Sequence, residues 1–151
     1  MATKNNGSTA EIFEQWKQED RSVEKAADCV MDWMRQVEQF GKPHFGETAS
    51  KLRPFRELLR KHFDREDRML DELATYYDED SAEIAAIRRQ SARDHTRLLE
   101  DLDDFIQRLN LLNPPFDSWQ AAMREFDLFF DRLEQHEDQE SESMNALMPR
   151  E

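Results

Sequence analysis

Apolar residues recur at intervals of three and four over four long segments of this 151-residue chain. A helix that buries one stripe of its surface needs this spacing, because 3.6 residues make one turn. Breaks rich in Gly, Pro and Asn separate segments at residues 41–43 and 113–115. The pattern predicts an all-α fold, an antiparallel up-down-up-down four-helix bundle, as one domain over residues 1–151 with its core at about 9–147. The four segments are, approximately, residues 8–40, 45–74, 81–111 and 117–147.

The ends of these segments carry weaker signals. Asp80 with Glu83, and Asp117 with Gln120, have the spacing of helix-capping pairs for the third and fourth segments. Pro54 interrupts the second segment and marks either a kink or the true first turn.

The net charge of −13 argues against nucleic acid or an anionic membrane surface as a partner. No apolar stretch approaches the roughly 20 residues that a membrane span needs. Residues 1–8 are polar and lack a signal-peptide pattern, so the expected compartment is the cytoplasm. The single cysteine, Cys29, permits no internal disulfide and is expected in or beside the core.

Polar residues interrupt the apolar stripes at a few positions. The second segment carries the pair His62 and Glu66, the third carries His95, and the fourth carries the pair His136 and Glu140. Residues four apart lie on the same helix face, so each His and Glu pair can converge on one point. A buried ionised carboxylate is costly without a partner, and a metal cation supplies one.

The depth of these residues in a bundle can be compared at about 1.5 Å per residue. Counted from the breaks, Asp20, Glu66, His95 and His136 agree within about one helical turn, or ~5 Å. All four helices can therefore bring a polar group to one layer. Asp20 is expected to ligate the metal through oxygen or to orient a ligand histidine.

A single histidine on an apolar face is more often a core residue that has found a hydrogen-bond partner. Two His and Glu pairs and a third histidine at matching depth favour a metal site instead. Imidazole with carboxylate suits Fe, Mn or Zn. A closed structural zinc site usually contains thiolates, and Cys29 lies at another level.

The motif order resembles the hemerythrin family, specifically the bacterial hemerythrin-like HHE cation-binding domain, over about residues 11–147. The matching elements are residues 61–67, which contain His62 and Glu66, then His95, and residues 135–140. The resemblance implies a bundle holding two non-haem irons, with carboxylates at the positions of Glu66 and Glu140 bridging them and histidines as terminal ligands.

Two positions depart from the family pattern. Asp20 stands where the family usually has a histidine, and Ser91 stands where oxygen-carrying hemerythrins have a second histidine one turn before His95. The predicted site is therefore poorer in nitrogen than that of a reversible oxygen carrier.

Three functional hypotheses follow. The first is a di-iron protein that binds or senses O2 or a related small oxidant, rather than an enzyme. The second is a di-iron enzyme that removes peroxide or nitric oxide, or oxidises ferrous iron. The third is a metal-free helical interaction module in which the buried polar residues only set the helix register. No feature of the sequence identifies a protein partner.

Overall fold

The computed structural model describes residues 6–39, 44–77 and 81–147. Within these ranges all regular structure is helical, and no strand is present. The prediction of an all-α fold is confirmed. The four helices are α1 (Asn6–Gln39), α2 (Phe45–Ala74), α3 (Ala82–Leu109) and α4 (Trp119–Leu147).

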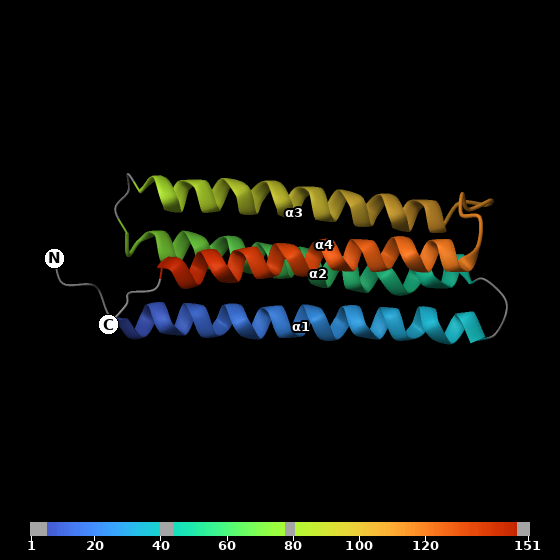
Figure 1. The fold of residues 1–151 in the computed structure, drawn as a ribbon, viewed down its shortest axis with the longest axis horizontal. Coiled ribbons are helices and arrows are strands. Elements are labelled where there is room, and N and C mark those ends of the chain that lie inside the picture. The colour runs from blue at the N-terminus through green and yellow to red at the C-terminus, as the bar shows by residue number, and fades with distance from the viewer. Residues whose placement is uncertain (1–5, 40–43, 78–80, 148–151) are drawn as a thin grey trace.

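The helices lie side by side along their lengths (Figure 1). Each one packs against two others, α1 on α2, α2 on α3, α3 on α4 and α4 on α1, so that together they enclose one interior. This bundle is held by its apolar stripes, since every helix places its periodic residues inward.

Serines cap the third and fourth helices. The Ser81 hydroxyl accepts a hydrogen bond from the Ile84 backbone N–H, and the Ser118 hydroxyl accepts one from Ala121. The sequence instead favoured Asp117, which lies one residue too early to reach these amides, and Asp80, which lies outside the described residues. A short hydroxyl adjacent to the first turn is as good an N-cap as a carboxylate.

The hydrophobic interior is divided into two clusters. The larger one includes Val23, Leu59, Leu98 and Leu133 and extends to Trp119. The smaller one occupies the opposite part of the bundle, where its members are Ile12, Phe13, Trp16, Met69, Leu70, Leu73, Ile84, Met144 and Leu147. Between the clusters, each helix contributes polar side chains to one layer of the interior.

The sequence predicted that Cys29 lies in or beside the core, but the structure shows it exposed. The inward stripe of α1 passes through Ala27 and Val30, which are buried. Because successive helical residues are about 100° apart, Cys29 is turned to the outer face.

Pro54 neither begins α2 nor ends it, since the helix runs unbroken from Phe45 to Ala74. A proline in a helix interior removes one backbone hydrogen bond and costs about 3 kcal/mol relative to alanine. Part of that cost is offset because proline also restricts the unfolded chain. We expect Pro54→Ala, an exposed substitution, to raise the free energy of unfolding by about 2 kcal/mol in urea denaturation. An unchanged or lower value would show that proline is no worse than alanine at this position of α2.

Among the described residues, no helix combines the length and apolar character that crossing a membrane requires.

Candidate metal centre

The polar layer contains all six residues that the sequence singled out. His62, Glu66, His95, His136 and Glu140 are buried, and Asp20 is partly buried. The imidazole of His62 and the carboxylate of Glu66 are fully enclosed, with 0% exposure. These side chains come from all four helices, at the common depth that the residue counts predicted.

The layer forms two groups of four residues, and in each group one donor atom per residue lies within 4.8 Å of the others. The first group is Glu66, His95, His136 and Glu140. The second is Asp20, His62, Glu66 and Glu137. Glu66 belongs to both groups, so its carboxylate lies between two candidate metal positions. We call these the two-histidine position and the one-histidine position.

Distances within the groups suit ligands arranged around a cation. His62 Nε2 lies 2.8 Å from Glu66 Oε1 and 2.9 Å from Glu137 Oε1. Two ligands at right angles, each about 2.1 Å from one ion, are about 3.0 Å apart. At the two-histidine position the Glu140 Oε1 atom lies 3.1 Å from His95 Nε2 and 2.9 Å from His136 Nε2. Both positions therefore have the ligand spacing of a metal centre.

Several of these donor atoms are buried and make no well-aligned hydrogen bond within the described part of the chain, even where an imidazole nitrogen and a carboxylate oxygen lie within 3 Å of each other. Buried polar atoms are almost always paired in proteins, so such a concentration requires an explanation. Cations at the two positions would satisfy them together, and in this respect the residues fit a metal pair. The atoms are Asp20 Oδ1, both carboxylate oxygens of Glu66, Glu137 Oε2, Glu140 Oε2 and His136 Nε2.

Charge leads to the same conclusion. Four carboxylates and three imidazoles share the layer. With all four carboxyls ionised, even three protonated imidazoles would leave one negative charge in this largely buried layer. Buried charges of this kind are otherwise neutralised by protons or by metal ions.

The pKa values of two of the acids show the cost of burying so many carboxyl groups together. Burial, with the neighbouring Glu137 carboxylate, raises the pKa of Asp20 to about 9. Burial likewise raises the pKa of Glu66 well above its usual value, against a smaller opposite effect of His95. Asp20 and Glu66 therefore hold a proton more strongly than an ordinary carboxyl does. A metal cation could replace that proton and supply the same neutralising charge.

The other two acids behave in the opposite way. Burial favours their protonated forms, but contacts with imidazoles outweigh it: His62 lowers the pKa of Glu137, and His136 with His95 lowers that of Glu140. For His95, burial lowers the pKa, but contacts with Asp67, Glu140 and Glu66 outweigh this effect and raise it to about 11. The two positions thus present ionised carboxylates to an incoming cation.

An outer carboxylate contacts the far nitrogen of each histidine. His62 Nδ1 lies 3.2 Å from Glu19 Oε2, and Arg65 fixes Glu19 at 2.6 Å. An Nδ1–H bonded to a carboxylate leaves Nε2 free to bind metal and keeps the ring in place. The other two contacts are His95 Nδ1 to Asp67 at 3.1 Å and His136 Nδ1 to Asp94 at 3.2 Å.

Aromatic packing fixes the orientation of the rings. Phe63 stacks on His95 with 4.0 Å between ring centroids and 9° between planes. His136 meets His95 edge to face at 4.9 Å. These contacts hold both Nε2 atoms toward the interior, so that little rearrangement is needed to bind a metal.

Sequence reasoning missed Glu137 and the three outer carboxylates. Glu137 is three residues before Glu140, hence on the same face of α4, and this spacing could have identified it. The Glu19, Asp67 and Asp94 side chains are each one residue from a predicted ligand. They are hard to recognise in a chain with 34 acidic residues, most of them on the surface.

A comparison of the chain with models of known protein families, with curated proteins and with solved structures finds no significant match.

Proposed function

We propose that the polar layer binds two metal ions, in the first place iron, and that the protein binds or senses O2 or a related small oxidant. The single observation that carries this proposal is the shared position of Glu66 in two buried groups of four ligands. One carboxylate between two ligand sets is the arrangement of a bridged metal pair.

The donor set narrows the choice of metal. Three imidazoles and four carboxylates suit iron, and manganese or zinc would also find acceptable ligands. Thiolates, which most structural zinc sites use, are absent from both groups. Iron and manganese, unlike zinc, also offer redox chemistry.

Two reduced irons, if bound, would supply an open coordination position for the oxidant and the electrons to reduce it. The chain's own residues supply orientation and enclosure. The three outer carboxylates fix the imidazoles, and the flanking apolar side chains Trp16, Phe63, Leu98, Phe129 and Leu133 are buried and exclude bulk water. A small neutral molecule can enter such an interior, whereas a large charged substrate cannot.

The resemblance to hemerythrin-like domains supports the same proposal, as does the order of the helices around the interior. An antiparallel up-down-up-down connectivity brings the residues of the layer to one depth, and we include it in the proposal. A cytoplasmic location belongs to it as well.

Two alternatives remain distinct from this function. Ser91 in place of a nitrogen ligand favours the first alternative, an enzyme that consumes peroxide or nitric oxide or oxidises ferrous iron. Repeated turnover of one of these substrates by the iron-loaded protein would distinguish an enzyme from a binding protein. A metal-free interaction module would have to neutralise the layer with protons on Asp20 and Glu66 instead of cations, and the effect of a chelator on stability distinguishes it.

Anaerobic loading with ferrous iron tests the proposal. After removal of unbound metal we expect about two irons per chain, and new visible absorption when air is admitted. Colourless protein with less than about half an iron per chain would contradict the proposal.

The role of Glu137 can be tested separately. We expect Glu137→Gln to weaken metal binding at the one-histidine position at least about tenfold and to leave the two-histidine position unchanged. Calorimetric titration with Fe²⁺ or Mn²⁺ would show this as a loss of affinity in one of two phases. Asp138→Asn is the matched control, since Asp138 is the next residue, is exposed and loses the same charge. Equal titration curves for Glu137→Gln and wild type would exclude Glu137 as a ligand.

A further inference from the structure

The two candidate metal positions differ in the donors that belong to each one alone. Apart from the shared Glu66, the one-histidine position has two carboxylates, Asp20 and Glu137, and the imidazole of His62. The two-histidine position has two imidazoles and a single carboxylate of its own, that of Glu140. One position is therefore rich in oxygen donors, and the other is rich in nitrogen donors.

Asp20 causes much of this difference. Its Oδ1 atom lies 3.9 Å from His62 Nε2, is buried and makes no well-aligned hydrogen bond, while its Oδ2 atom accepts a long hydrogen bond of 3.5 Å from the Ser141 hydroxyl. No lysine or arginine contacts this carboxylate within the described residues. A metal cation is the partner that would allow Asp20 to stay ionised. A histidine at this place would instead have given each position two imidazoles.

The outer carboxylates increase the contrast between the two positions. A carboxylate that accepts a hydrogen bond from the far nitrogen of a histidine makes that imidazole a stronger metal ligand. Glu19 has this place beside His62, but it also forms an ion pair with the Arg65 guanidinium at 2.6 Å. Because the positive charge of Arg65 draws on the same carboxylate, Glu19 strengthens His62 less than an unpaired acid would.

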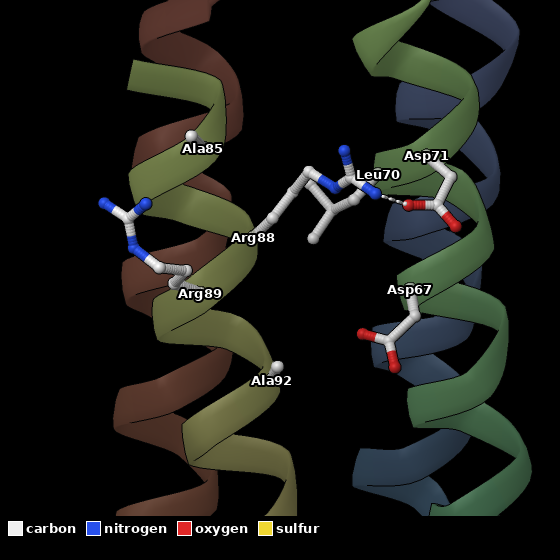
Figure 2. Close-up of a pocket in the computed structure, with 7 residues that line it drawn as sticks. All are labelled: Asp67, Leu70, Asp71, Ala85, Arg88, Arg89 and Ala92. Atoms are coloured by element: carbon white, nitrogen blue, oxygen red, sulfur yellow. Dashed lines mark hydrogen bonds and ion pairs between the residues drawn. The ribbon is translucent and has the colours of Figure 1, made fainter. Parts of the chain in front are cut away.

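The two-histidine position has outer acids of another kind. Asp67 and Asp94 have no lysine or arginine within ion-pair distance in the described part of the chain. Figure 2 shows the groove between α2 and α3 that contains Asp67, where the nearby Arg88 extends to Asp71 and pairs with that carboxylate instead. The two imidazoles of this position therefore keep the full effect of their outer acids, and His62 is the weakest nitrogen donor of the three.

We infer that the two positions select different metals, so that the two-histidine position takes Fe²⁺ and the one-histidine position takes Mn²⁺ when both ions are offered. The inference rests on the proposed function and specifies the metal content of the same site. Affinity rises from Mn²⁺ to Fe²⁺ at most sites, but imidazole suits iron whereas carboxylate suits manganese. The advantage of iron over manganese is therefore larger at the two-histidine position. A limited supply of iron goes there first, and manganese in excess fills the other position.

The charge of the layer permits this mixed occupancy. Two divalent cations balance the four carboxylates of the two groups, whichever of the two metals each position holds. The exchange of Fe²⁺ for Mn²⁺ changes no charge, so the choice between them depends on the donor atoms alone.

Anaerobic loading with about one equivalent of Fe²⁺ and about ten equivalents of Mn²⁺ per chain tests the inference. After desalting, elemental analysis should find about one iron and one manganese per chain. Crystals of this protein, with anomalous scattering recorded on both sides of the iron and the manganese absorption edges, locate each metal. We expect the ratio of iron to manganese beside His95 and His136 to exceed the ratio beside His62 at least about tenfold. Iron that is not enriched at the two-histidine position would overturn the inference.

Variants of Asp20 test the cause of the selection. Asp20→His exchanges a carboxylate for an imidazole, so under the same loading iron should be shared about equally between the two positions. Asp28→His is the matched control, since Asp28 lies about two turns further along α1, is exposed and undergoes the same change. Its metal distribution should equal that of the wild type. An unaltered distribution in Asp20→His would overturn the inference.

Asp20→Asn keeps the test valid if the histidine variant does not fold. It removes the charge and adds no imidazole, so we expect calorimetric titration with Mn²⁺ to show about tenfold weaker binding at one position and unchanged binding at the other. Equal titration curves for Asp20→Asn and wild type would overturn the inference. Wild-type protein that binds neither metal overturns the proposed function and this inference together, whereas two bound metals without selection overturn this inference alone.

Discussion

Replacing Glu66 with glutamine is expected to reduce metal binding from two ions per chain to no more than one. Glu66 is the one residue common to both ligand groups, and both of its oxygens are buried without a well-aligned hydrogen bond. An amide keeps the shape of the side chain but loses the negative charge and cannot bridge two cations equally. Elemental analysis after loading with excess Fe²⁺ or Mn²⁺ and desalting measures the effect.

The matched control for this prediction is Glu72→Gln, on the same helix and exposed. It should retain two ions. The Glu66→Gln protein prepared without metal should be at least as stable as the wild type without metal, because the variant no longer buries a carboxylate whose pKa is raised by burial. A Glu66→Gln protein that still binds two ions with unaltered affinity would refute the bridging role.

Removal of metal is expected to cause the largest loss of stability. Each site, at a free metal concentration about 100 times its Kd, stabilises the fold by about 2.7 kcal/mol, so two sites contribute about 5 kcal/mol. For a chain of this size 1 kcal/mol corresponds to roughly 2–4 °C. We therefore expect a chelator to lower the Tm of the metal-loaded protein by about 10–20 °C in a calorimetric scan.

A chelator control is needed, because chelators also change ionic strength. The same chelator saturated before addition with the metal that the protein holds should leave the Tm of the metal-loaded protein nearly unchanged. If the free chelator also leaves the Tm unchanged, the buried polar layer is stable without cations, and the metal-free interaction module becomes the better description.

The helices were predictable because their stabilisation is local and periodic. The spacing of apolar residues indicates which face of each helix is buried, and the common depth of Asp20, Glu66, His95 and His136 follows from counting residues at a fixed rise. The helix ends were less predictable. Serine and aspartate are both good N-caps and stand next to each other at both helix starts. Only the structure shows that the hydroxyls of Ser81 and Ser118 reach the first amides.

The metal centre was predictable where a residue type is unusual for its position. A histidine or glutamate on an apolar stripe, such as His62 or Glu66, contrasts with its neighbours. Glu137 could have been found from its spacing to Glu140, but the outer acids Glu19, Asp67 and Asp94 have no such contrast, since their helices carry many other acids. Only the three-dimensional packing shows which of these carboxylates reaches an imidazole.

A crystal structure of the iron-loaded protein, with anomalous scattering recorded on both sides of the iron absorption edge, tests the central claim most directly. The account predicts two iron peaks inside the bundle, about 3.5–4 Å apart, one on each side of the Glu66 carboxylate. A bundle interior without an anomalous peak, in protein loaded with excess ferrous iron, would contradict it.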